Sequence, residues 1–291
     1  MTSQITIRRA TPADASVCGR ILFDAFGGIA RKHNFPLDFP SFDAVGGMMN
    51  LCITHPKFFG VVAEREGVVV GSNFLDQRDA IAAVGPITVD PNQQTSGVGR
   101  RLMQAVIERG LADGHPGIRL VQDAFNTTSM PLYTSLGFDI KEPLALMQGR
   151  PKDKPAAKGK ARQMTSQDIP ACADLCRSVH GFDRANELAD AVRMFNPMLL
   201  ERSGRVVAYV TAPNFWFLNH GVAEREEDMF ELLLGAAAAG DQSLALLVPT
   251  RNAAFFRWAL SQGLRMAKPM SLMAMGRYYD PRGCFYPSVG C

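Results

Sequence analysis

The stretch "DPNQQTSGVGRRL", Asp90 to Leu102, decides the fold of this chain. It follows "VGPITV" (Val84 to Val89), an apolar run rich in β-formers, and it leads into "RRLMQAVIERGLADG", where apolar residues recur at helical spacing. This order predicts a strand, a glycine-rich turn and an amphipathic helix that starts near Gly97 and stops near Gly114.

Two glycines, Gly97 and Gly99, stand in the first turn of the predicted helix. The first N–H groups of a helix have no intrahelical acceptor, and this end carries a partial positive charge, so it can bind an anion. Glycine lets a phosphate approach closely. The sequence lacks the lysine and hydroxyl of a Walker loop and the spacing of a dinucleotide-binding turn. A tight turn or helix cap is the alternative explanation.

A second motif, "NTTSMPLYTSLGF", runs from Asn126 to Phe138 and combines an asparagine, a helix with Tyr133 and a Gly-Phe pair that opens a strand. With Gln94-x-x-Gly97-x-Gly99, it resembles the two signatures of the GNAT N-acetyltransferases. The resemblance covers roughly residues 5 to 148. It implies an α/β (α+β) fold, in which a mixed, mostly antiparallel twisted sheet is flanked by helices.

The resemblance also implies a site for acetyl-CoA as the cosubstrate. Backbone groups near Ile87 and Val89 would hold the pantetheine arm and the acetyl carbonyl, and Asn126 would bond the pantetheine region. The pyrophosphate would be bound by the loop residues Gln94, Thr95, Ser96, Gly97, Val98, Gly99 and Arg100. Tyr133 would protonate the departing thiolate, since a phenol titrates not far above a thiol. The alternative for Tyr133 is an aromatic ring packed in the core.

The general base and the acceptor site are less defined by sequence. Asp123, near the end of the strand before Asn126, could take the proton of the amine; Asp76 is the rival, and either could be a structural carboxylate. By resemblance, the loop from Gly27 to Gly47 covers the acceptor cleft, so His33 and Phe35 in this loop are candidate substrate residues. Asp76, at the end of the hairpin strand in "GSNFLDQRD", is a third candidate. This loop has no acidic run suited to a histone-like tail, which favours a small amine.

The second half of the chain resembles the first. A shift of 126 residues pairs "RLVQDAFN" with "ALLVPTRN" and "GFDIKEPLALM" with "GLRMAKPMSLM", whereas a shift of 154 pairs Thr11 and Asp14 with Thr165 and Asp168. A shift of 137 aligns "EREGVVV" with "ERSGRVV". We therefore expect two tandem GNAT folds: a catalytic domain over 1–148, a basic Pro/Lys linker over 149–162, and a degenerate domain with a C-terminal tail over 163–291.

The second copy lacks the residues that would bind acetyl-CoA. Under the 126 shift, Gly97, Gly99, Tyr133 and Asp123 become Ala223, Arg225, Ala259 and Pro249, while Asn126 and Gly137 are kept as Asn252 and Gly263. Its helix begins with "EREED", whose carboxylates would repel a pyrophosphate. One acetyl-CoA site per chain is predicted.

Two predictions concern the C-terminal end of each half of the sequence. Each half offers one strand after its Gly-Phe or Gly-Leu pair, where a single GNAT domain usually has two, so the halves are expected to complete each other's sheets. The tail "RYYDPRGCFYPSVGC" is too apolar for a free end. It would either line the acceptor pocket or cap the second domain.

Composition excludes several other classes of protein. The net charge of +3 is too small to argue for nucleic acid, and no apolar run is long enough to span a membrane. There is no signal-peptide core, so a cytoplasmic monomer or homodimer with reduced cysteines is expected. Cys172, Cys176 and His180 recur at helical spacing, but a core stripe is favoured over a metal site.

The function expected from these motifs is acetyl transfer to the primary amine of a small molecule, with tyrosine as the general acid. A non-catalytic acyl-CoA sensor or assembly module is the alternative from another class. A protein lysine acetyltransferase is a further alternative, and it would need an open acceptor groove.

Overall fold

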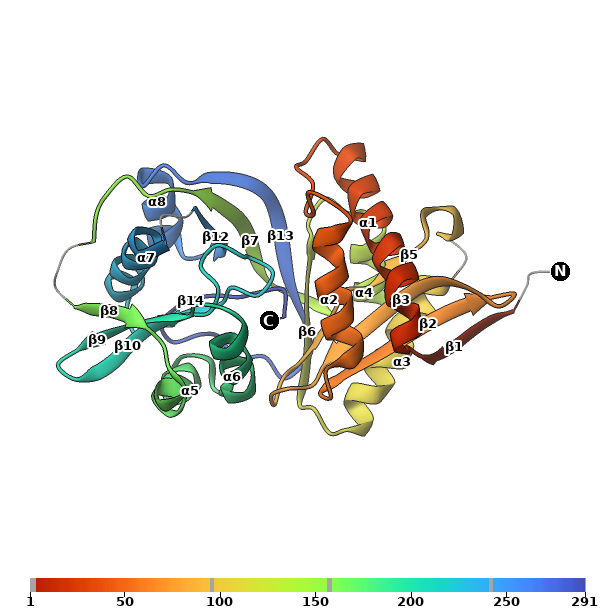
Figure 1. Cartoon of the computed structure of the whole chain (residues 1–291), viewed down its shortest axis with the longest axis horizontal. Coiled ribbons are helices and arrows are strands. Elements are labelled where there is room, and N and C mark those ends of the chain that lie inside the picture. Colours follow the sequence, from red (N-terminus) through yellow and green to blue (C-terminus); the bar gives the residue numbers. More distant parts are fainter. Residues whose placement is uncertain (1–3, 95–96, 156–158, 241–242, 291) are drawn as a thin grey trace. The chain divides into compact units, whose positions relative to one another are not determined.

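The computed structural model describes residues 4–94, 97–155, 159–240 and 243–290 (Figure 1). The chain divides into two units. The first unit runs to Arg119 and also includes Asn126–Phe138, and the second unit contains Leu120–Phe125 and everything from Asp139 onward. This division differs from the predicted boundary at residue 148, for a reason found in the strand pairing.

The first unit is built on a twisted sheet with the strand order β1-β2-β3-β4-β6, in which β5 also pairs with β3. Only the β4–β6 pairing is parallel among the strand pairs of this unit that the structure describes. The strands are β1 (Ile5–Arg9), β2 (Phe58–Arg65), β3 (Val68–Asp76), β4 (Ala82–Val84), β5 (Thr88–Val89) and the start of β6 (Gly117–Asp123). The predicted mixed, mostly antiparallel sheet is therefore confirmed.

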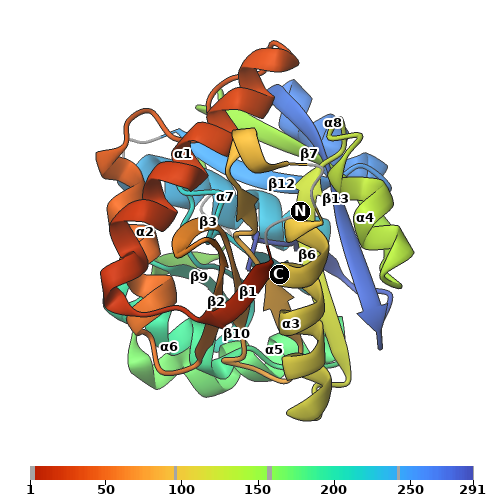
Figure 2. The same ribbon diagram turned by 90° about the vertical axis from the view of Figure 1, so that its right-hand side faces the viewer.

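Helices cover both faces of this sheet. Figure 2 shows α1 and α2 on one side of β1–β3 and α3 on the other. The helices are α1 (Ala15–Lys32), α2 (Asp43–Thr54), α3 (Val98–Ala112) and α4 (Ser129–Ser135), with the 3₁₀ turns η1 (Pro12–Asp14) and η2 (Pro91–Gln93). Helix α3 has the predicted limits and buries Leu102, Met103, Val106 and Ile107. The predicted acceptor loop over 27–47 was too long, because α1 continues through Gly27 and Gly28.

The second unit holds a sheet with the strand order β14-β11-β10-β9-β8 and its own helices. Its core includes Leu232, Leu246 and Phe255, all without exposed surface. The elements are β8 (Lys160–Gln163), η3 (Ser166–Asp168), α5 (Ile169–His180), α6 (Ala185–Met194), β9 (Met198–Arg202), β10 (Arg205–Val210), β11 (Gly221–Ala223), α7 (Glu226–Gly240), β12 (Leu244–Pro249), α8 (Ala253–Ser261), β13 (Arg265–Gly276) and β14 (Cys284–Tyr286).

The last strands of the two sequence halves are exchanged within the second unit. Strand β7 (Asp139–Gly149) pairs with β12 on one side and with β13 on the other, and the end of β6 pairs with β13. Ala124 N donates to Pro269 O at 3.1 Å, and Thr250 N donates to Pro143 O at 2.9 Å, two bonds related by the 126-residue shift. Because β7 pairs with later strands, it belongs to the second unit.

The predicted linker over 149–162 is also shorter than expected. Gly149 is still the last residue of β7, and Lys160 already begins β8. The residues in between include the prolines and most of the lysines that suggested a linker. The sequence pattern missed the start of β8 because a four-residue edge strand gives little apolar periodicity.

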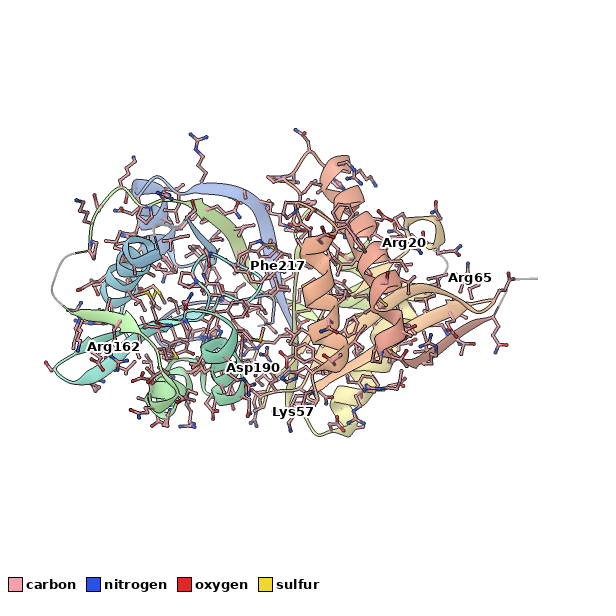
Figure 3. All side chains as sticks on the ribbon, viewed as in Figure 1. Arg20, Lys57, Arg65, Arg162, Asp190 and Phe217 are labelled. Carbon is pink, nitrogen blue, oxygen red and sulfur yellow. The ribbon has the colours of Figure 1, made fainter. Side chains whose placement is uncertain are left out.

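The two halves share a polar cluster at equivalent places. Arg8 Nη1 lies 2.8 Å from Asp14 Oδ2, and Arg162 Nη1 lies 2.8 Å from Asp168 Oδ2 (Figure 3 labels Arg162). Each arginine also binds a glutamate of the next hairpin, Glu64 or Glu201. The hydrogen bonds from Arg8 lower the pKa of Asp14 to about 2, and Arg162 likewise lowers the pKa of Asp168. These clusters fix the first strand of each half to the helix that follows it.

The C-terminal tail is part of the second unit's sheet. Strand β14 pairs with β11, and Tyr286 is fully buried with its hydroxyl donating to Asn219 Oδ1 at 2.9 Å. Farther on, Val289 N donates to Phe217 O at 3.0 Å. The tail therefore docks onto the second unit, as one of the two expectations had it. Among the described residues, no helix has the length and apolar character needed to cross a membrane.

Candidate active site

The turn before α3 is held by its own polar groups. Asp90 Oδ1 accepts a hydrogen bond from Asn92 N at 2.8 Å, and Arg65, labelled in Figure 3, donates to Gln93 Oε1. Gly97 is the N-cap of α3 and has a φ of +82°, a left-handed conformation that disfavours other residues. The turn itself therefore requires this glycine. Two other predicted loop residues, Thr95 and Ser96, lie outside the described residues.

Gly99 cannot be explained in the same way. It lies inside the first turn of α3, and a Cβ built on it would meet Leu132 Cδ2 at 3.5 Å and Val89 Cγ2 at 3.8 Å, which are ordinary contacts. Alanine stabilises a helix relative to glycine by up to about 1 kcal/mol. The fold alone would therefore favour alanine here. The contacts within the chain therefore do not require glycine at position 99.

The residues before and after Gly99 differ in the chemical groups that they expose at the start of α3. The side chain of Val98 is buried, so it packs in the core and only its backbone N–H is available at the helix end. Arg100 is exposed, and its Nη2 donates to Ser135 Oγ at 2.8 Å. Gln94 is exposed on the loop before the turn. This end of α3 therefore offers N–H donors and the guanidinium of Arg100.

The predicted single strand "VGPITV" is two short strands. Gly85 and Pro86 interrupt it, and β5 pairs with β3 at Thr88↔Ser72 and Val89↔Gly71. Asp90 N donates to Val70 O at 2.9 Å, so Asp90 and, two residues earlier, Thr88 direct their backbone groups toward β3. Ile87 and Val89 therefore direct their N–H and C=O groups to the opposite edge. That edge can bind an extended chain with its own amides.

Helix α4 lies beside the start of α3, as the Leu132 and Ser135 contacts show. Its Tyr133 is 6% exposed, and the ring lies 6.5 Å from that of Phe138 at an angle of 64°. The tyrosine is therefore packed in the core of the first unit and is also carried by the helix next to the glycine turn. The two explanations for Tyr133 are compatible.

Asn126 has a structural task that the sequence did not reveal. Its Oδ1 accepts hydrogen bonds from Thr128 N and Ser129 N, both at 3.1 Å, at the start of α4. Asn252 does the same for α8, where Phe255 N donates to its Oδ1 at 3.0 Å. Helix capping therefore explains why both halves keep an asparagine here. The amide Nδ2 of Asn126 is the group left to bind a ligand.

The two candidate bases have different surroundings. Asp76 is buried, and both of its oxygens accept hydrogen bonds from Arg78, including Nη2 to Oδ2 at 2.5 Å. Nothing in these contacts supports a role for Asp76 with a substrate. Asp123 Oδ1 lies 2.7 Å from the Nζ of Lys268, a residue that the sequence analysis did not single out. Lys268 lies on β13, so only the exchange of strands reveals this pair.

The remaining candidate substrate residues follow α1. His33 caps the end of α1 through its N–H to Ile29 O at 3.2 Å, and Phe35 N donates to Ala30 O at 2.9 Å. The loop between α1 and α2 is fixed by the ring of Phe39 against that of Phe26, 6.0 Å apart. These contacts describe how the loop is folded. Roles for His33 and Phe35 in binding a substrate stay predictions.

In the second unit, the corresponding helix start is that of α7, where charged side chains form ion pairs with one another. Asp228, without exposed surface, accepts from Arg202 Nε at 2.6 Å and from Arg225 Nε at 3.1 Å. Arg225 stands where the shift places Gly99. The start of α7 thus carries an arginine–aspartate ion pair where the start of α3 has a glycine.

The Cys172 and Cys176 stripe lies in a hydrophobic core. Burial raises the pKa of Cys172 to about 12 and that of Cys176 to about 11. Neutral thiols are poor metal ligands. In the described part of the chain, no group of three or more His, Cys, Asp or Glu side chains is placed to hold a metal ion.

Comparisons with known proteins identify similar sequences and folds. Residues 28–138 match the acetyltransferase (GNAT) family. A mycothiol acetyltransferase of Kocuria rhizophila is 43% identical over 60 residues, which are 21% of this chain and 20% of that protein. The alignment thus spans about a fifth of the relative's length.

Solved structures share the fold over nearly the whole chain. A protein from Pyrococcus horikoshii assigned to the acetyltransferases has a TM-score of 0.74 and 18% identity, with 94% of this chain and 89% of that chain covered. A GCN5-related N-acetyltransferase from Sphaerobacter thermophilus has a TM-score of 0.62 and 15% identity, with 96% and 98% covered. The fold is therefore GNAT-like.

Proposed function

Because residues 28–138 belong to the GNAT acetyltransferase family, we propose that this protein is an acetyl-CoA-dependent N-acetyltransferase that acts on the primary amine of a small molecule. The cosubstrate would bind at the start of α3 and along the outer edge of β5. We further propose that 1–148 carries the active site and that 163–291 is a degenerate copy that does not bind acetyl-CoA.

The observation that carries this proposal is Gly99. The glycine occupies a helical position where a Cβ would meet no obstruction and would stabilise the helix. A pyrophosphate held by the N–H groups of the first turn would, however, come close to this Cα. The equivalent turn in the second half carries Arg225 instead and is neutralised by Asp228.

The other residues have roles that follow from their positions. The outward N–H and C=O groups of Ile87 and Val89 would pair with the amides of the pantetheine arm, as one β-strand pairs with another. Gln94 and the following loop up to Arg100 would bind the pyrophosphate, with Arg100 supplying positive charge. Asn126 would donate through Nδ2.

Transfer requires the amine nitrogen to attack the thioester carbon while the C–S bond breaks. The thiolate that leaves takes a proton, which Tyr133 would supply, and the attacking amine loses one. Asp123, directly or through water, would accept the proton of the amine. Phenol and thiol have reference pKa values of about 10 and 8.5, which makes the transfer to sulfur feasible when the two groups are hydrogen-bonded.

Calorimetric titration with acetyl-CoA tests the cofactor site on the whole chain. One site per chain is expected, with weaker binding in Gly99→Ala. Gly28→Ala is the matched control, because Gly28 also lies in a helix and a Cβ on it would meet nothing within 4 Å. Two sites would contradict the degenerate second copy, and absence of binding would refute the proposal.

Release of free thiol across a panel of amines, polyamines, amino acids and aminoglycosides tests the reaction. We expect turnover on at least one amine and a loss in Tyr133→Phe without loss of acetyl-CoA binding. Binding without turnover on any amine would instead support an acyl-CoA sensor. Turnover on lysine-containing peptides alone would support a protein lysine acetyltransferase.

A further inference from the structure

A buried ion pair closes the end of β6. Asp123 Oδ1 lies 2.7 Å from Lys268 Nζ, and the two side chains are only 13% and 4% exposed. The ammonium also lies 5.1 Å from the ring of Trp216, in cation–π geometry. Lysine is almost never fully buried without a partner. The pair is therefore a specific feature that needs an explanation.

The exchange of strands does not by itself require a lysine at this position. The 126-residue shift relates Lys268 on β13 to Glu142 on β7, and the adjacent prolines accept the same backbone hydrogen bonds. Glu142 is also buried, but it binds Arg251 Nη1 at 3.2 Å and Tyr278 Oη at 3.3 Å. The two equivalent positions on β7 and β13 thus hold a carboxylate in one strand and an ammonium in the other. At position 268 the lysine lies within ion-pair distance of the carboxylate of Asp123.

The pair leaves the carboxylate with two unequal oxygens. Oδ1 is buried and faces the ammonium, whereas the side chain as a whole keeps some exposure. A charge-assisted contact through Oδ1 restricts the orientation of the whole carboxylate.

We propose that Lys268 is a positioning residue for the acetyl transfer, which fixes the orientation of the Asp123 carboxylate, the proposed acceptor of the proton that the amine loses. This inference rests on the proposed function, and it gives the second half of the sequence a part in the reaction. Asp123 accepts the proton that the amine loses, and Lys268 itself exchanges no proton.

Steady-state kinetics on the full chain test this role. We expect Asp123→Asn and Lys268→Met each to lower kcat by about 100-fold, the lower end of what a general base contributes. The KM for acetyl-CoA should stay unchanged, because neither residue belongs to its binding turn. Lys268→Arg keeps the charge and should recover most of kcat.

The double variant Asp123→Asn/Lys268→Met separates the positioning role from a purely structural one. If Lys268 acts through Asp123, adding Lys268→Met to Asp123→Asn causes no further loss of kcat. The double variant also leaves no unpaired buried charge, so it should fold even if Lys268→Met does not. Glu142→Gln is the matched control, since it alters the mirrored position without touching Asp123.

Several outcomes would overturn the inference. Wild-type kcat in Asp123→Asn or in Lys268→Met would do so, and so would a further fall of kcat in the double variant. An equal loss in Glu142→Gln would show that the exchange as a whole, and not Lys268, is being disturbed. If the wild-type chain binds acetyl-CoA but acetylates no amine, the proposed function fails first, and this inference fails with it.

Discussion

Replacing Gly99 by alanine should change stability and cofactor affinity in opposite directions. In the free protein the new Cβ meets only Leu132 Cδ2 at 3.5 Å and Val89 Cγ2 at 3.8 Å, so no strain is introduced. The higher helix propensity of alanine should then stabilise the fold by up to about 1 kcal/mol. For a chain of this size the melting temperature should rise by about 1 to 3 °C.

The same methyl group should weaken the binding of acetyl-CoA. If it displaces the pyrophosphate from one N–H of the first turn, the loss of a hydrogen bond to a charged group is about 1.5 to 3 kcal/mol. This corresponds to a rise in Kd of roughly 10-fold or more. Calorimetric titration and thermal unfolding of the same samples measure the two effects.

Gly97→Ala supplies the contrast. Its φ of +82° makes alanine unfavourable by about 1 to 2 kcal/mol, so this variant should lose stability with or without a ligand. The reasoning would be refuted if Gly99→Ala lowered the melting temperature as Gly97→Ala does. It would also be refuted if Gly99→Ala bound acetyl-CoA with wild-type affinity.

Three other predictions follow from separate parts of the molecule. The pKa of Asp14 is about 2 in the folded protein, against an ordinary value of 3.8. This difference adds up to about 2 kcal/mol to the free energy of unfolding at neutral pH, and the contribution is lost as the pH falls from 4 toward 2. Urea unfolding at several pH values measures this dependence. Asp14→Asn should remove this part of the pH dependence of the unfolding free energy, and an unchanged pH dependence would contradict the role given to Asp14. Gly221→Ala should destabilise the second unit by more than about 2 kcal/mol, because its Cβ would overlap the ring of Tyr286. Tyr286→Phe, the control, should cost only about 1 kcal/mol for the bond to Asn219, and equal effects in thermal unfolding would refute this account. Tyr133→Phe should lower kcat at least about 100-fold while acetyl-CoA affinity is kept; an unchanged kcat would assign Tyr133 to the core alone.

The sequence predicted the features that depend on neighbouring residues. Helix α3 has its expected limits because Gly97, the apolar spacing and the final glycine all act locally. The loss of the glycine turn in the second half could be read from Arg225, although the ion pairs of Asp228 could not.

The features that sequence reasoning missed depend on residues far apart in the chain. The ion pair between Asp123 and Lys268 joins residues on β6 and β13, so no local sequence pattern predicts it. Asn126 was given a role with the ligand only, yet its Oδ1 caps α4. Pro86 divides the expected strand because it has no N–H to donate. The roles of the loop residues with acetyl-CoA stay predictions until binding is measured.

The exchange of β7 and β13 has a genetic consequence. A stop codon or a frameshift before Arg265 would remove β13, and with it the strand that pairs with the end of β6 and the partner of Asp123. A lesion in the second half of the gene would therefore damage a strand encoded in the first half. The fold of the end of β6 thus depends on residues encoded far downstream, on β13.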